Sequence, residues 1–63
     1  MTRLEMIGEI RTLLPELWAQ GRFELAKEIM GGIHQDDFRG VDERTVRQIW
    51  SELTAAVRSL PDD

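Results

Sequence analysis

Apolar residues recur every three or four positions through two long stretches of this chain. In the first stretch they are Leu4, Ile7, Ile10, Leu14 and Leu17. In the second they are Val46, Ile49, Leu53, Ala56 and Leu60. This spacing places side chains on one face of an α-helix, and nothing in the sequence shows the strict alternation of a half-buried strand. The fold class is therefore predicted to be all-α.

The first helix is predicted over about residues 2–20. Thr2 and Glu5 have the spacing of a capping box, in which each side chain binds a backbone N–H group near the helix start. Pro15 cannot donate a helical hydrogen bond. Because the apolar periodicity continues to Trp18, we expect a kink at Pro15. The alternative is a helix that ends earlier and a second short segment that begins at Pro15.

Two further helices are predicted, over about residues 22–31 and 42–60. The glycines that delimit the first of them are Gly21, Gly31 and Gly32. Asp42 is a good N-cap for the last helix, and Pro61 ends it. The chain is thus expected to form one domain, residues 1–63, in which a helical hairpin is followed by a C-terminal helix.

A chain of 63 residues without cysteine has few means of stabilising itself. Such a chain buries only about 60% of the surface that it exposes when unfolded. The predicted core consists of Ile7, Ile10, Ile29, Ile49, Leu53 and Val57. The apolar arc of the first helix spans about 180°, although about 100° is enough for a surface helix. We therefore expect another chain to cover part of it, in a homodimer or a hetero-complex with a protein partner.

Residues 10–33 resemble the helical hairpin of tetratricopeptide repeats. That motif joins two antiparallel helices through a glycine, followed by an aromatic and then a small residue. Gly21, Phe23 and Ala26 stand in this order, while Leu14 departs from the pattern because the family has a small residue there. The resemblance implies that Gly21 turns the chain, that Phe23 packs across the hairpin and that Ala26 allows close helix contact.

Residues 24–29 (ELAKEI) and 44–53 (RTVRQIWSEL) are similar to the two helices of bacterial helix-turn-helix DNA-binding proteins. The residues that this resemblance implies as base or phosphate contacts are Arg44, Thr45, Arg47 and Gln48. Fifteen residues separate Ile29 from Thr45, whereas the motif has a turn of about 3–4 residues. The net charge of −4 also weighs against nucleic acid, because cations supply most of that affinity. A DNA-binding transcriptional regulator is the alternative function.

The favoured function is a small helical module for protein–protein interaction. It would bind and regulate a larger cytoplasmic protein, as an inhibitor, adaptor or anti-activator. The residues predicted to contact the partner are Leu13, Leu17, Trp18 and Phe38. For Phe38, the alternative is a loop anchor that tucks under the helices. Large apolar side chains of this kind dominate protein interfaces, and tryptophan above all.

Catalysis and metal binding are not expected from this sequence. His34 lies near Asp36 and Asp37, but these residues lack the spacing of zinc or di-iron ligands. No serine or other nucleophile has a histidine near it in the sequence, so we expect no enzyme, no cofactor and no small-molecule substrate. No apolar run is long enough to span a membrane, and no secretory signal opens the chain. A cytoplasmic location is the resulting expectation.

Overall fold

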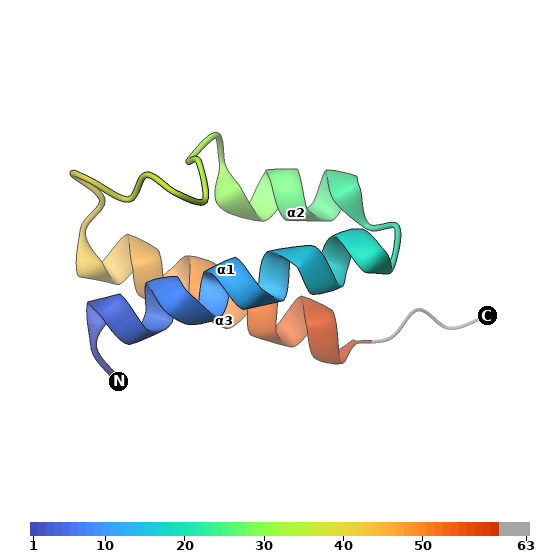
Figure 1. The fold of residues 1–63 in the computed structure, drawn as a ribbon, viewed down its shortest axis with the longest axis horizontal. Coiled ribbons are helices and arrows are strands. Elements are labelled where there is room, and N and C mark those ends of the chain that lie inside the picture. The colour runs from blue at the N-terminus through green and yellow to red at the C-terminus, as the bar shows by residue number, and fades with distance from the viewer. Residues whose placement is uncertain (60–63) are drawn as a thin grey trace.

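The computed structural model describes residues 1–59, which form three α-helices (Figure 1). These are α1 (Arg3–Ala19), α2 (Phe23–Met30) and α3 (Glu43–Arg58). The all-α prediction is confirmed, and each helix begins within one residue of its predicted start. The predicted end of the third helix near Leu60 and Pro61 lies outside the described residues.

The first helix begins with the predicted capping box. The Thr2 hydroxyl accepts a hydrogen bond from the backbone N–H of Glu5 at 3.2 Å, and the Glu5 carboxylate accepts one from the backbone N–H of Thr2 at 2.9 Å. The helix continues through Pro15 as a single element. Pro15 lies on its exposed side, where water can reach the backbone carbonyl that the proline leaves without a partner.

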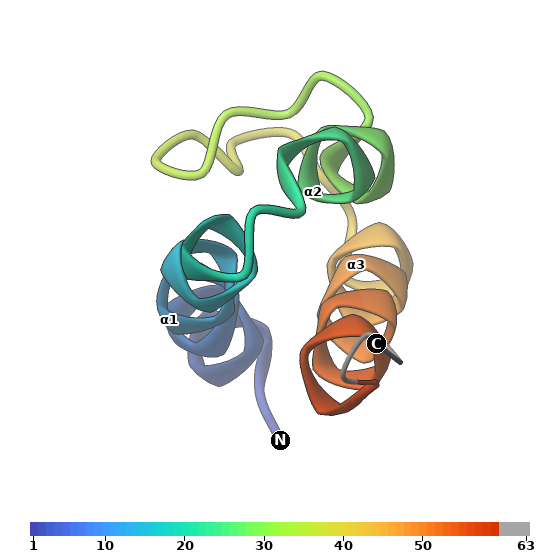
Figure 2. The same ribbon diagram turned by 90° about the vertical axis from the view of Figure 1, so that its right-hand side faces the viewer.

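Helices α1 and α3 run parallel and side by side, and α2 returns antiparallel to both (Figures 1 and 2). The Trp50 indole N–H of α3 donates to the Glu9 carboxylate of α1 at 3.0 Å, close to the middle of both helices. The largest fully buried side chains all come from these two helices: Met6, Ile10, Leu17, Val46 and Leu53. Each such side chain contributes roughly 1.5–3 kcal/mol on burial, so this contact is the main source of stability.

Helix α2 is only half as long as its neighbours. Its 8 residues extend over about 12 Å, whereas the 17 residues of α1 extend over about 25 Å. The loop of residues 31–42 therefore covers the remainder of α1 and α3 (Figure 1). Phe38 of this loop is only 5% exposed and belongs to the core cluster. Phe38, one of the predicted partner contacts, therefore fills the core where α2 is missing and offers almost no surface to another chain.

Two arginines near the starts of α1 and α2 donate hydrogen bonds to backbone carbonyls elsewhere in the chain. Arg3 donates to the carbonyl of Phe38 and so holds the loop against the start of α1. Arg22, at the start of α2, donates to the carbonyls of Ala56 and Ser59 at 2.7 and 2.8 Å. A cation at this position also interacts favourably with the negative C-terminal end of the α3 dipole.

The predicted core is found largely as expected. Four of the six predicted residues are buried, namely Ile7, Ile10, Ile49 and Leu53. Ile29 and Val57 are partly buried and pack against the same cluster.

The two phenylalanines provide a matched test of this fold. Phe38→Ala should lower the free energy of unfolding by about 3–5 kcal/mol, which is enough to unfold much of a domain this small. Phe23→Ala should change it by less than about 0.5 kcal/mol, because Phe23 is 60% exposed. Urea denaturation followed by circular dichroism measures both values. Equal losses for the two variants would contradict the placement of Phe38 in the core.

The capping box predicts a dependence of stability on pH. The hydrogen bond from the Thr2 backbone N–H holds the pKa of Glu5 below its ordinary value of 4.5, and the Thr2 hydroxyl lowers it further. Because the folded pKa is depressed, the stabilisation is present above pH 4.5 and is lost as the pH falls through the folded pKa. Wild type should therefore exceed Glu5→Gln in stability at pH 7, and the difference should shrink below pH 4.5.

Urea denaturation between pH 7 and pH 3 measures this difference. Glu52→Gln is the control, because Glu52 is exposed and makes no side-chain hydrogen bond within the described residues. A difference between wild type and Glu5→Gln that stays constant, or grows on acidification, would rule out the proposed charge effect.

Candidate functional site

A groove of about 320 Å³ lies between the second half of α1 and α2. We call it the Trp18–Phe23 groove. Its lining residues are Leu14, Trp18, Phe23, Ala26, Lys27, Met30, Ile33, His34 and Gln35.

Two aromatic side chains form the walls of the groove. Trp18 of α1 is 36% exposed, and Phe23 of α2 is 60% exposed. Counting 100° per residue, Trp18 lies at the edge of the buried face of α1, beside Leu14. Phe23 is the first residue of α2, directly after the turn at Gly21 (φ 74°), and the same count places it at the edge of the buried face beside Ala26. The helices therefore present both rings at their surface.

The floor of the groove is part of the domain core. Leu14, Ala26 and Met30 are all buried, and each also lines the groove. Ala26 contributes only a methyl group, so the floor lies low between the two aromatic walls. The result is a concave apolar surface, of the kind that ligands and partner side chains enter.

The loop after α2 closes one end of the groove. Arg11 of α1 donates to the carbonyl of Gln35 at 3.3 Å and forms an ion pair with Asp36 at 3.5 Å. These contacts hold the loop residues Ile33, His34 and Gln35 in place. The His34 Nδ1 atom accepts a hydrogen bond from the backbone N–H of Asp36 at 3.1 Å, so in the neutral ring the proton lies on Nε2.

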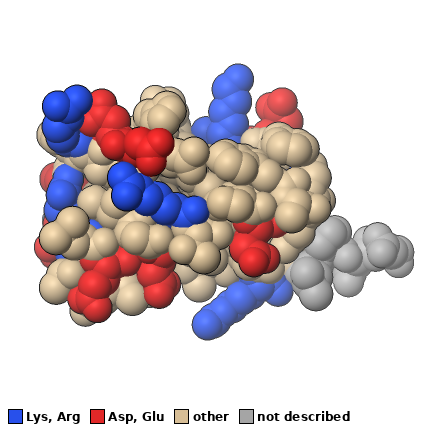
Figure 3. Space-filling view, in the orientation of Figure 1, with Lys and Arg blue, Asp and Glu red and all other residues tan. Residues whose placement is uncertain are grey.

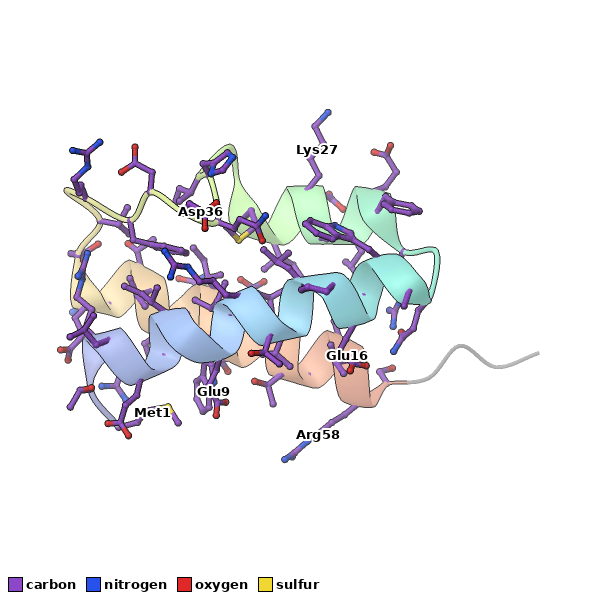
Figure 4. All side chains as sticks on the ribbon, in the orientation of Figure 1. Met1, Glu9, Glu16, Lys27, Asp36 and Arg58 are labelled. Atoms are coloured by element: carbon purple, nitrogen blue, oxygen red, sulfur yellow. The ribbon has the colours of Figure 1, made fainter. Side chains whose placement is uncertain are left out.

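The polar side chains that line the groove are Lys27, His34 and Gln35. Lys27 and His34 are its titratable lining residues, and within residues 1–59 no carboxylate lines it. Figure 3 shows that the surface over α2 and the second half of α1 is mostly free of charged side chains. In Figure 4, Lys27 extends outward from α2, whereas Glu16 lies on the side of α1 that faces away from α2. By formal charge the lining carries +1, from Lys27, whereas the chain as a whole carries −4; Glu24 and Glu28 of α2 are exposed but lie outside the lining.

The four residues predicted to contact a partner do not lie on one surface. Trp18 is part of the groove, but Leu17 is fully buried between the helices and is not available to a partner. Leu13 is half-buried and lines a different surface depression, on the Met1 side of α1. Phe38, as described above, belongs to the core. The α1 periodicity identified the apolar residues without showing which edge α2 leaves uncovered.

Sequence reasoning missed Phe23 as an exposed residue. The tetratricopeptide resemblance implied that this ring packs across the hairpin; in the structure 60% of the residue is exposed. Gly21 has a positive φ of 74°, and Ala26 is buried. A signal was present, because Phe23 and Lys27 are four residues apart and share one edge of the second helix.

The residues of the DNA-binding alternative lie in the first half of α3. Arg47 pairs with Glu43 at 3.4 Å, and the Thr45 hydroxyl donates to the Asp42 carboxylate. Arg44 and Gln48 are exposed. Twelve residues connect α2 to α3, and the acidic side chains near the start of α3 would face any phosphate bound there.

The acidic side chains of the loop around His34 form ion pairs with arginines of this chain. Asp36 pairs with Arg11, and Asp37 pairs with Arg39 at 3.1 Å. Among residues 1–59, no group of three or more histidine, cysteine or acidic side chains is placed to hold a metal ion. In this same part of the chain, no helix combines the length and apolar character needed to cross a membrane.

Comparison with known protein families, curated proteins and solved structures gave no match to this chain. Membership of the tetratricopeptide family therefore stays a prediction from the sequence. The residues of the groove are therefore the basis for the function proposed below.

Proposed function

We propose that this chain is a small helical protein–protein interaction module, which binds and regulates a larger cytoplasmic protein through the Trp18–Phe23 groove. The observation that carries the proposal is the pair of exposed aromatic side chains on either side of an apolar floor. Aromatic anchors in pockets of this kind supply most of the binding energy in protein interfaces.

The domain leaves parts of two large aromatic side chains unburied. Covering the exposed parts of Trp18 and Phe23 would contribute about 2 kcal/mol in total, from roughly 1.5–3 kcal/mol for burial of a whole apolar side chain. Offset stacking or edge-to-face contact with a partner ring adds about 0.5–1.5 kcal/mol. These gains are large beside the few kcal/mol that stabilise a domain of this size.

The internal contacts of α3 favour this proposal over the DNA-binding alternative. Two of the four candidate DNA contacts, Thr45 and Arg47, already bind acidic side chains of their own helix start. A phosphate would have to replace Asp42 and Glu43 while both carboxylates remained close by, which opposes binding.

Capture of a partner tests the proposal. Tagged wild-type chain is incubated with native lysate, with and without nuclease, beside the variants Phe23→Ala and Leu4→Ala. Leu4 is 77% exposed and lies outside the groove, so its variant controls for general loss of apolar surface. We expect a stoichiometric protein that wild type and Leu4→Ala retain after nuclease and that Phe23→Ala binds at least tenfold more weakly, which corresponds to a loss of about 1.4 kcal/mol.

Two results would count against the proposal. Equal capture by all three chains would show that the groove is not the contact surface. Recovery of nucleic acid that depends on Arg47, tested with Arg47→Glu, would establish the DNA-binding alternative instead.

A further inference from the structure

The polar groups at the groove constrain the chemistry of its occupant. Lys27 offers three N–H donors, and it forms no ion pair within the described residues. His34 presents its Nε2–H donor, since Nδ1 is already occupied by the backbone N–H of Asp36. The nearest loop carboxylate, Asp36, is paired with Arg11. Among the lining residues, Lys27 and His34 thus supply N–H donors, and no lining side chain within residues 1–59 is a carboxylate. The lining therefore favours an occupant that carries a carboxylate, which would pair with Lys27 in place of the exposed Glu24 and Glu28 of the same helix.

The size of the exposed surface indicates how the occupant is built. The exposed parts of the Trp18 and Phe23 rings amount to roughly 200 Å², taking about 150–250 Å² for a whole aromatic side chain. A stable interface between two folded proteins buries about 800 Å² per partner. The two rings alone thus offer far less area than a pair of rigid copies buries, whereas a single helix can contact both walls and the floor.

We propose that the Trp18–Phe23 groove binds a short amphipathic helix of a partner protein, with an acidic residue beside its apolar anchors that pairs with Lys27. This inference rests on the proposed function and adds the form and charge of the bound segment.

The dimensions of α2 set the length of that helix. The groove follows α2, whose 8 residues extend over about 12 Å, and the loop at residues 33–35 closes one end. About two turns of helix fit this length. Anchors spaced three or four residues apart would insert between Trp18 and Phe23, which is the usual pattern for a helix bound in a groove. Lys27 extends outward from α2 (Figure 4), so it would meet a side chain on the solvent side of such a helix.

A displayed library of random 16-residue peptides tests this inference directly. Peptides are selected on wild-type chain, and labelled copies of the enriched peptides are titrated by fluorescence polarisation. We expect enriched peptides with apolar residues at helical spacing and a net negative charge. Their affinity should fall at least tenfold for Phe23→Ala and for Lys27→Glu, and less for Lys27→Gln. Glu28→Gln is the matched control on α2, because Glu28 is exposed and does not line the groove.

Each other result overturns a defined part of the account. Enriched peptides that lose affinity for Phe23→Ala but bind Lys27→Glu equally well would refute the acidic helix and leave the proposed function standing. Enriched peptides that bind Phe23→Ala as tightly as wild type would refute both. Sedimentation of a dimer that dissociates in Phe23→Ala would show that the occupant is a second copy of this chain. Circular dichroism establishes that each variant is folded.

Discussion

The parallel contact between α1 and α3 supports every other feature of this structure. The fully buried side chains all come from these two helices, and Trp50 and Glu9 join them on the surface. Parallel neighbours cannot be joined by a tight turn, so the chain must return along their whole length between them. Helix α2 and the loop of residues 31–42 make this return. Their own arrangement follows from the need to cover the open side of the α1–α3 pair.

The unequal lengths of the helices create the groove. Because α2 spans about half of α1, the return divides into a helical part and a loop, and each part covers one end of the core. Phe38 completes the core under the loop. Helix α2 leaves part of Trp18 exposed, and its own first residue, Phe23, is also exposed. Arg3, Arg11 and Arg22 then fix the loop and the turns through backbone carbonyls. The exposed aromatic pair is thus a consequence of how the core is closed.

The sequence predicted the parts of the fold that depend on local rules. The starts of α1 and α2 follow from Thr2 and Gly21, and most of the core follows from the period of the apolar residues. Asp42 stands at the N-cap of α3, but its carboxylate accepts from the Thr45 hydroxyl and makes no capping hydrogen bond. The sequence left open whether Phe38 is buried and did not predict that Phe23 is exposed, because both depend on the length of α2 relative to its neighbours. Nor could it reveal the arginine contacts, since a backbone carbonyl leaves no residue-specific signal. On the first helix, Leu4 and Trp18 keep apolar surface exposed, whereas Leu17 lies inside the domain.

If the core is closed in this way, water reaches the aromatic rings of the groove but not the ring of Phe38. In NMR spectra of dilute chain, a soluble paramagnetic complex broadens the signals of exposed protons and spares buried ones. We expect strong broadening at the Phe23 ring and intermediate broadening at the Trp18 indole, with the Phe38 ring protected. Broadening at Phe38 as strong as at Phe23, or protection of both rings of the groove, would contradict the proposed closure of the core and remove the basis for a binding surface between α1 and α2.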